Sequence, residues 1–169
     1  MNQSDFLKVV LPFKDKVFRL AKRLLVSTEE AEDATQELLF KLWKSKEKLA
    51  DYNNVEAFAM TMTKNYCYDR LKSKQASNLN LVHRNYKEKE TSLDKKLEYR
   101  DSVNQVHLLI ESLPEQQKII MQLRDIEQYD FEEICKMVDM KPTAVRVALS
   151  RARKTIREEL IKKHNYGVS

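Results

Sequence analysis

Glycine is nearly absent from this chain of 169 residues, whose single glycine, Gly167, stands close to the C-terminus. Common tight hairpins need Gly or Asn at positive φ, and phosphate-cradling loops need several glycines close together. The sequence therefore excludes a Rossmann nucleotide site, a P-loop and a glycine-rich kinase loop. Because there are also only three prolines, little interrupts helices, and we expect an all-α fold.

Cysteines and long apolar runs are scarce as well. Cys67 and Cys135 stand far apart and form no metal-ligand spacing with the histidines, so we expect reduced thiols, no metal and no cofactor. Asp5 and Lys8 precede any long apolar run, so no signal peptide is evident. No segment approaches the ~18 uncharged residues of a membrane span. These absences predict a cytoplasmic protein that does not insert into a membrane itself.

The most informative part of the sequence is the stretch 128–160, which holds two helical patterns with a short break between them. The first pattern places apolar residues on one helical face. They are Phe131, Ile134, Cys135 and Val138. Asp130 is a candidate N-cap with Glu133 three residues on, as in a capping box. Pro142 then marks the start of the second helix.

This second helix has one apolar face and one basic face. The apolar face consists of Val145, Ala148, Leu149, Ala152, Ile156 and Leu160. Residues 141–163 carry eight Lys or Arg and two Glu, a net of +6, whereas residues 111–133 carry seven Asp or Glu and two Lys or Arg, a net of −5. An anchoring helix, a tight turn and a basic helix are the parts of a helix-turn-helix, whose second helix enters the major groove of DNA. A helical hairpin with a solvated basic face is the alternative.

Two long helices are expected near the N-terminus. Residues 4–26 form one helix, or two helices broken at Pro12. Residues 29–44 follow a capping box made by Ser27 and Glu30. The first turns of the helix over residues 29–44 are acidic, and negative charges are favourable at a helix N-terminus. A solvated helical face is the alternative reason for these charges.

A polar connection over residues 46–54 leads to a further helix, residues 55–74, which Asn53 or Asn54 can cap. This helix interleaves aromatic residues with cations, as a single-stranded nucleic acid requires, because bases stack on π-faces and phosphates need positive charge. Its large apolar residues are Phe58, Met62 and Tyr66, for which a core stripe is the alternative role.

The domain organisation follows from a change of character in the middle of the chain. Residues 75–102 are polar, charged and weakly periodic, which is typical of a linker. We therefore predict two small helical domains, residues 1–76 and 103–163, joined by a flexible linker over residues 77–102 and followed by a short tail, residues 164–169.

Four segments carry a resemblance to a known family. They are AEDATQELLFKLW (31–43), NYCYDRLKSK (65–74), SLPEQQKIIMQLRDIEQYDFEEIC (112–135) and AVRVALSRARKTIREEL (144–160). In this order, with a short linker and no third region, they resemble the bacterial RNA polymerase sigma factors of the extracytoplasmic-function (ECF) group of the sigma-70 family. The resemblance covers nearly all of the chain. It implies a factor for promoter recognition and DNA melting that performs no covalent chemistry.

The resemblance also implies the partners, which are core RNA polymerase and promoter DNA. The acidic helix would dock the clamp helices of the polymerase β′ subunit through Asp33, Gln36, Glu37 and Leu38. The C-terminal domain would hold the tip of the β flap in an apolar cleft. Family members usually have an anti-sigma factor, so such a partner is expected here.

In the N-terminal domain the resemblance assigns contacts to the −10 element, bound as single-stranded non-template DNA. Tyr52 and Asn65 match positions that line a pocket for a flipped base, where stacking and edge hydrogen bonds offset an unstacking cost of a few kcal/mol. The candidate phosphate contacts are Lys41, Lys64, Arg70, Lys72 and Lys74.

In the C-terminal domain it assigns contacts to the −35 element as duplex. The groove-facing positions are Arg146, Val147, Ser150 and Arg151. Arg146 and Arg151 could be bidentate to guanine, for about 1–3 kcal/mol of discrimination each. Thr143, Arg153 and Lys154 would hold phosphates.

Three positions depart from the family pattern. Met60 replaces a common Trp, which weakens any expectation of aromatic stacking there. Lys141 stands where a Ser usually caps the recognition helix, so Thr143 or water must serve. Val147 replaces a common polar reader and could touch a thymine methyl group but donates no hydrogen bond.

Two other functions compete with this interpretation. A dimeric helix-turn-helix repressor, acting on a palindromic operator without polymerase, fits poorly with a long linker and an acidic N-terminal helix. An enzyme would need a hidden site among His83, His107 and Cys67, and the sequence shows no nucleophile with a base and no metal set.

Overall fold

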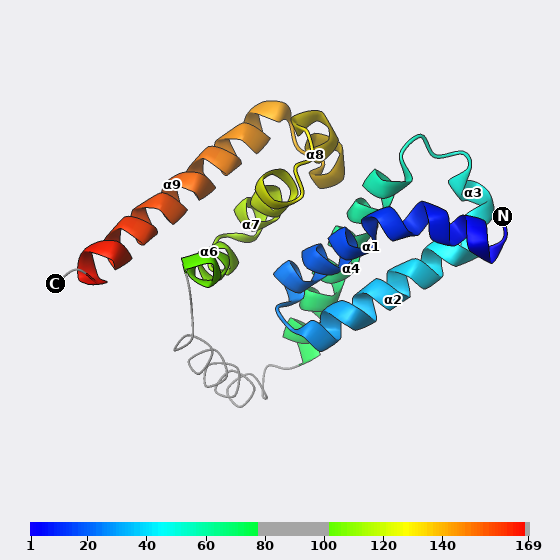
Figure 1. Ribbon diagram of the computed structural model, residues 1–169, viewed down its shortest axis with the longest axis horizontal. Helices are drawn as coiled ribbons and strands as arrows, with labels where there is room; N and C mark the ends of the chain where they lie inside the picture. Colours follow the sequence, from blue (N-terminus) through cyan, green and yellow to red (C-terminus); the bar gives the residue numbers. More distant parts are fainter. Residues whose placement is uncertain (78–101, 168–169) are drawn as a thin grey trace.

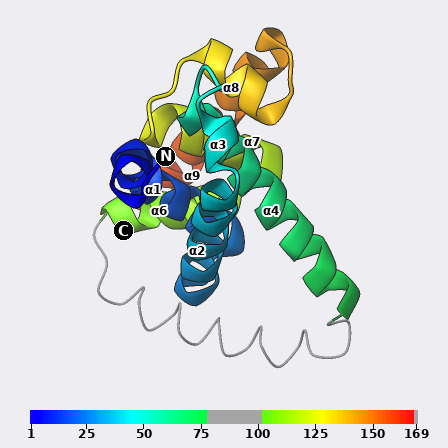
Figure 2. The same ribbon diagram turned by 90° about the vertical axis from the view of Figure 1, so that its right-hand side faces the viewer.

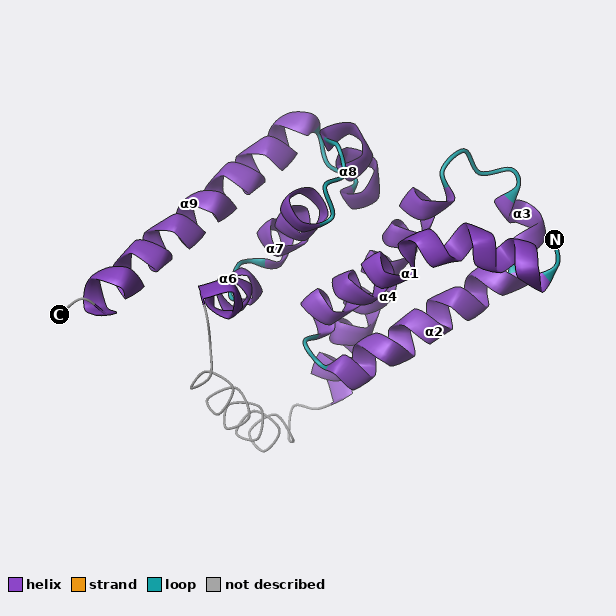
Figure 3. Cartoon of the chain, viewed as in Figure 1, coloured by secondary structure: helices purple, strands orange, loops and turns teal. Residues whose placement is uncertain are grey.

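The computed structural model describes residues 1–77 and 102–167, and every regular element in these two stretches is a helix (Figure 3). The all-α prediction is therefore confirmed. Most of the predicted linker, residues 78–101, and the last two residues of the tail lie outside the described residues.

The N-terminal unit contains the helices before the linker. They are α1 (Gln3–Leu25), α2 (Thr28–Lys44), α3 (Lys46–Leu49) and α4 (Val55–Ser77). α1 runs unbroken through Pro12, which lies on its exposed side, where the carbonyl left without an N–H partner reaches water. Two predicted caps are present, since Ser27 Oγ accepts from the Glu30 N–H at 3.3 Å and Asn54 Oδ1 accepts from the Ala57 N–H at 3.0 Å.

The predicted polar connection over residues 46–54 is wrong in its first half, which forms the short helix α3. Leu49 is the reason, because its side chain is only 2% exposed and joins the core of the unit. One apolar residue in a polar stretch gives no helical periodicity, so the pattern could not reveal this turn.

The C-terminal unit contains the helices after the linker. They are α6 (Ser102–Glu111), α7 (Glu115–Met121), the π-helical turn η1 (Gln122–Ile126), α8 (Phe131–Val138) and α9 (Pro142–Gly167). Asp130 caps α8 as predicted, accepting from the Glu133 N–H at 2.8 Å. α8 ends at Asp139 in the left-handed conformation, with φ 54°. α9 begins at Pro142 as expected and continues to Gly167, beyond the predicted boundary at residue 163.

The two units pack against each other in the described structure. α1 contacts α7 and η1, and α4 contacts α8. In Figures 1 and 2, α9 lies on the far side of α6–α8 from the N-terminal unit. The buried residues of both units form one continuous apolar cluster. This packing leaves the outer face of α9 free and places α8 against α4.

Candidate nucleic-acid and protein interfaces

α9 separates its apolar residues from its basic ones as the sequence predicted. Val145 and Ala152 are completely buried and Leu149 is nearly so, and together they hold the helix on α6, α7 and α8. The residues predicted for −35 contacts are all exposed, on the flank and the outer side of the helix. They are Thr143, Arg146, Val147, Ser150, Arg151, Arg153 and Lys154.

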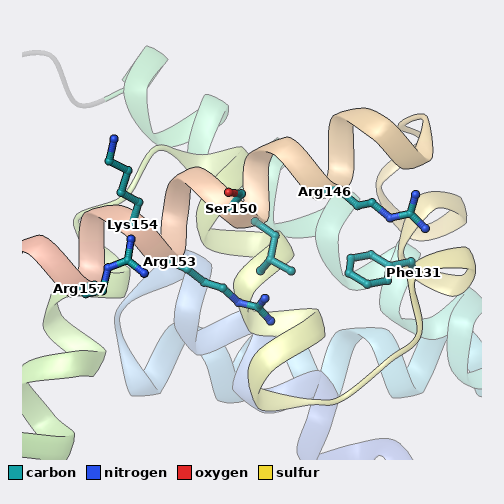
Figure 4. A pocket seen from close by; sticks show the side chains of 7 residues that line it. Phe131, Arg146, Ser150, Arg153, Lys154 and Arg157 are labelled. Atoms are coloured by element: carbon teal, nitrogen blue, oxygen red, sulfur yellow. The ribbon is translucent and has the colours of Figure 1, made fainter.

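A hollow of about 390 Å³ lies along this exposed side, between α9 and the start of α8 (Figure 4). Its lining residues are Phe131, Arg146, Leu149, Ser150, Arg153, Lys154 and Arg157. The Phe131 ring forms one end of the hollow. The guanidinium carbon of Arg146 lies 5.3 Å from its centre and that of Arg124 lies 4.5 Å from it. A cation over an aromatic face is attracted by the ring quadrupole, so Phe131 orients both arginines.

Arg153 has a different environment from its basic neighbours on α9. Its Nε and one terminal nitrogen donate to Asp125 of η1 at 3.1 and 2.5 Å, a bidentate pair at the surface. This hydrogen bond, chiefly, raises the pKa of Arg153. Asp125 offsets the charge of Arg153, so this arginine ties α9 to η1 and presents less net charge to a phosphate than Lys154 does.

Phe131 and Arg157 were missed as candidate binding residues. Arg157 was identifiable, because it stands three residues after Lys154 and seven after Ser150 on one helical face. Phe131 was assigned only to the buried face of α8, and no spacing in the sequence indicates that its ring meets two arginines from other elements.

In the N-terminal unit, Tyr52 and Asn65 lie along one side of α4. The half-exposed Tyr52 ring stacks on Phe58, with centroids 4.4 Å apart and planes 18° from parallel. Asn65 is exposed and stands seven residues after Phe58, hence two turns along the same helical face. The fold therefore places an exposed aromatic platform and an exposed amide on one surface, which is the chemistry that an unstacked base needs.

Two of the cations predicted to contact phosphates lie against Tyr66. The Lys41 ammonium of α2 lies 5.2 Å from the centre of its ring, and Arg70 donates to its hydroxyl at 3.2 Å. Lys72 is exposed, while Lys74 forms an ion pair with Glu30. The large apolar residues Phe58, Met62 and Tyr66 are each half-buried against the core, so their side chains serve packing as well as this surface.

Lys64 has a partner that the sequence could not predict. Its ammonium group donates to the main-chain carbonyl of Met137, near the end of α8, at 2.8 Å. Burial lowers the pKa of Lys64, and the nearby Asp139 carboxylate opposes that change. Lys64 was predicted to contact a phosphate of the −10 element, but in this arrangement its ammonium group is bound to the C-terminal unit.

The predicted polymerase-binding residues are divided between surface and core. Asp33, Gln36 and Glu37 are exposed on one face of α2, whereas Leu38 is only 2% exposed. Leu38 therefore packs α2 onto the core and presents no side chain to a partner here. Phe40 was missed and is 51% exposed on the face of Gln36 and Glu37, with the Lys44 ammonium 4.4 Å from its ring centre. The sequence pattern could have identified Phe40 as a candidate contact, because it is a large apolar residue on an otherwise acidic, solvated helical face.

The described residues include no group of three His, Cys, Asp or Glu side chains able to hold a metal ion. Burial raises the pKa of Cys67 to about 12, so this thiol is un-ionised at neutral pH. Within the described parts of the chain, none of the helices has the length and apolar content needed to cross a bilayer.

Two family models match the chain, one on each helical unit. The model for sigma-70 region 2 matches residues 9–77, and that for sigma-70 region 4 matches residues 104–156. The first match contains α2 and α4, and the second contains α9 as far as residue 156.

Curated relatives and solved structures agree with these matches. The chain is 28% identical over 159 residues to the ECF RNA polymerase sigma factor SigE of Mycolicibacterium smegmatis, covering 92% of this chain and 61% of that protein's length. It is 27% identical over 165 residues to the ECF RNA polymerase sigma-E factor of Escherichia coli K12, covering 92% of this chain and 86% of that protein.

The fold resembles that of two proteins solved as complexes. One is the sigma factor RpoE of Bartonella quintana with the anti-sigma factor NepR, at TM-score 0.68 and 18% identity, covering 92% of this chain and 96% of that one. The other is CnrH with the cytosolic domain of CnrY, at TM-score 0.66 and 15% identity, covering 95% and 90%. Since regions 2 and 4 of one family match in order on its two helical units, this chain belongs to the sigma-70 family of RNA polymerase sigma factors and to its ECF group, proteins that direct the polymerase to promoters.

Proposed function

We propose that this chain binds core RNA polymerase through the exposed face of α2, reads the −35 element as duplex through α9, and holds the −10 element as a melted single strand along α4. These assignments correspond to a domain over residues 1–76, a linker over residues 77–102, a domain over residues 103–163 and a tail over residues 164–169. The chain contributes binding energy and no covalent step.

The observation that supports this proposal most is the division of α9 into a buried apolar face and an exposed basic face, with Phe131 of α8 beside the basic face. A helix docked by Val145 and Leu149 can enter a major groove without loss of packing, because nothing on its outer face belongs to the core. Arg146 and Arg151 are exposed at its first turns, where a recognition helix meets base edges.

On α4, the proposed −10 contacts combine stacking with charge. Tyr52 offers an aromatic face and Asn65 an amide for the edge of an extruded base, while Lys41, Arg70, Lys72 and Lys74 supply positive charge for the strand. Lys64 joins this set only when its contact with α8 is broken. Capture of one base offsets part of the melting cost without ATP.

On α2, Asp33, Gln36 and Glu37 form the proposed contact with the β′ clamp helices, and Phe40 adds an apolar anchor. Aromatic anchors surrounded by polar residues are typical of protein interfaces. In the C-terminal unit, exposed Val103 on α6 and Ile161 on α9 are the candidates for holding the β flap, because these two helices pack together.

The proposal includes an anti-sigma partner and a cytoplasmic site of action. The two solved structures of similar fold each hold an anti-sigma factor or the cytosolic domain of a second protein, which supports such a partner here. The cytoplasm is proposed because core polymerase and promoter DNA are there.

Run-off transcription with purified core polymerase on a library of genomic fragments tests the proposal. We expect new start sites that depend on this chain and share upstream elements near −10 and −35. A dimeric repressor would instead elute as a tight symmetric dimer on gel filtration and bind operator DNA without polymerase, which would contradict the proposal.

A further inference from the structure

We propose that the hollow beside α9 is a binding site for an oligophosphate, a short chain of linked phosphates that is either inorganic or part of a nucleotide. The polar groups of the site are Arg146, Ser150, Lys154 and Arg157, over a floor made by Leu149. Competition of this ligand with duplex DNA rests on the proposed function of α9. The binding itself is a property of the free chain.

The shape of the hollow suits a small ligand. Its volume of about 390 Å³ falls in the range of about 300–1,000 Å³ that is typical of small-molecule sites. Leu149 is only 2% exposed and closes the floor. Figure 4 shows Arg146 beside Phe131 at one end of the hollow, Lys154 and Arg157 at the opposite end, and Ser150 between them. The hollow is therefore a bounded site with cations at both ends.

Most of the positive charge around the hollow is uncompensated. Asp125 accepts two hydrogen bonds from Arg153, at 3.1 and 2.5 Å, and offsets its charge. Arg146, Lys154 and Arg157 are exposed and have no carboxylate partner among the residues that the structure describes. Like charges repel one another, so three free cations around one hollow favour an anionic ligand.

The far end of the hollow lies too far along α9 to be explained by DNA reading. A recognition helix meets base edges with its N-terminal residues. α9 begins at Pro142, so Arg146 lies about 6 Å and Arg157 about 22 Å along the helix axis from its start. The major groove is only about 8.5 Å deep. The hollow therefore extends beyond the part of α9 that a groove can hold, and the proposed function gives Arg157 no ligand.

The lining residues favour phosphate over other anions. The fork of an arginine matches two phosphate oxygens, a lysine adds a point charge, and a serine hydroxyl donates a hydrogen bond. Each terminal phosphate carries up to two negative charges, since its second pKa is about 6, so three cations suit a short chain of phosphates. An acidic helix of a protein partner needs an apolar groove. This hollow offers it only Leu149 and Phe131 as apolar lining.

An oligophosphate and duplex DNA share part of α9. Arg146, Ser150 and Lys154 belong both to the hollow and to the proposed −35 surface, whereas Arg151 belongs to the −35 surface alone. A ligand in the hollow occupies the shared side chains, so each of the two ligands weakens the binding of the other. The cellular concentration of such a ligand thereby sets how readily α9 engages a −35 element.

Isothermal titration calorimetry of the free full-length chain with sodium tripolyphosphate, at constant ionic strength, tests the site. We expect saturable binding of one tripolyphosphate per chain. Arg157→Ala should weaken it about tenfold, because charge-assisted hydrogen bonds are lost. The same variant should change the binding of a short random-sequence duplex much less.

Two variants of exposed cations on α9 are matched controls. Arg151→Ala should show the reverse pattern, a weaker duplex complex and unchanged tripolyphosphate binding, because Arg151 does not line the hollow. Lys163→Ala removes the same charge away from the hollow and should leave tripolyphosphate binding unchanged. Circular dichroism shows that each variant keeps its helices. Equal losses in Arg157→Ala and Lys163→Ala would indicate general attraction to a basic helix and would overturn the site.

Competition is measured by fluorescence anisotropy of a labelled duplex. Tripolyphosphate should displace the duplex from the wild-type chain at lower concentration than from Arg157→Ala. If sodium sulfate at the same ionic strength displaces the duplex equally well, the effect is screening and the competition is overturned. An oligoglutamate peptide that binds more tightly than tripolyphosphate, and depends on Arg157, would overturn the oligophosphate in favour of an acidic protein partner.

A comparison of adenosine triphosphate with tripolyphosphate distinguishes the two sources of the phosphate chain. Tighter binding of the nucleotide, with its advantage lost in Phe131→Leu, supports a nucleotide ligand. Equal or tighter binding of tripolyphosphate supports an inorganic one, and binding of neither overturns the site. None of these measurements uses polymerase. A failed run-off assay would therefore contradict the proposed function, while calorimetry still decides whether the hollow binds an oligophosphate.

Discussion

The guanidinium carbon of Arg146 lies 5.3 Å from the centre of the Phe131 ring, so an aromatic residue of α8 orients an arginine on the outer face of α9. If Arg146 reads a guanine, Arg146→Ala should cost about 1–3 kcal/mol at that base pair and relax the −35 preference. Run-off transcription on promoters that differ only at −35 measures this. Binding to core polymerase in a pull-down should be intact, and an equal loss there would contradict the assignment.

Phe131 should influence the same preference without touching DNA bases. Phe131→Leu removes the ring that holds Arg146 and Arg124, so we expect a partial loss of −35 discrimination, smaller than that of Arg146→Ala. Phe131→Tyr keeps the π-face and should retain discrimination. If the Leu and Tyr variants behave alike in the promoter series, Phe131 has no orienting role.

The Asp125–Arg153 pair predicts effects of different size for two neighbouring cations. Lys154→Ala should reduce the slope of log affinity against log salt for duplex DNA by about 1, since one phosphate contact is lost. Arg153→Ala should change the slope less, because Asp125 already offsets its charge. Asp125→Ala should strengthen duplex binding. Fluorescence anisotropy across a salt series distinguishes these cases, and a weaker Asp125→Ala complex would contradict the argument.

Leu38 and Phe40 form a matched pair on α2, one buried and one exposed. Leu38→Ala should destabilise the fold by about 2–5 kcal/mol, as buried leucines do. Phe40→Ala should leave stability nearly unchanged, because its ring is 51% exposed, yet weaken core polymerase binding. Denaturant unfolding and a polymerase pull-down separate the two effects. Leu11→Ala, at another exposed apolar residue on α1, is the control for surface hydrophobicity.

Asn65 is predicted to act after promoter binding. Asn65→Ala should lower open-complex formation, detected by permanganate footprinting, more than it lowers closed-complex binding, because the amide meets a base only after that base leaves the stack. A template with a pre-melted bubble should restore part of the activity. If the bubble gives no rescue, Asn65 does not hold a flipped base.

His107 predicts a pH dependence of stability. Burial and the facing Arg23 lower the pKa of His107 below its ordinary value of 6.5, and Glu111 opposes them. At a pH between the pKa of His107 in the unfolded chain, 6.5, and its lower pKa in the folded chain, the unfolded chain binds more protons than the folded one. The contribution of neutral His107 to stability is therefore complete above pH 6.5 and is lost as the pH falls from 6.5 through the lower pKa. We expect the Tm difference between wild type and His107→Gln to shrink from about pH 7.5 to about pH 5.5. An equal difference at both values would contradict this.

Local patterns in the sequence predicted most of the helices and the faces they bury. The alternation of Val145, Ala148 and Leu149 with polar residues predicted the buried side of α9. Asp130 and Ser27 were identified as caps, and Asn54 was one of two candidates for a third, because caps and helical faces depend on residues only a few positions apart. The exposed outer face of α9 follows from the same periodicity. The family resemblance, also carried by the sequence alone, agrees with the region 2 and region 4 matches.

What only the tertiary structure decided are the contacts between residues that are distant in the chain. Arg19 and Glu127, Lys64 and Met137, and Arg146 and Phe131 are joined by the way the helices pack, and no spacing in the sequence encodes such pairs. Periodicity tells which side of a helix is buried, but it does not tell which helix covers it. The sequence by itself determined two helical units, the second of which carries a basic helix. The packing of these units decided which of their charged side chains are bound to other parts of the protein.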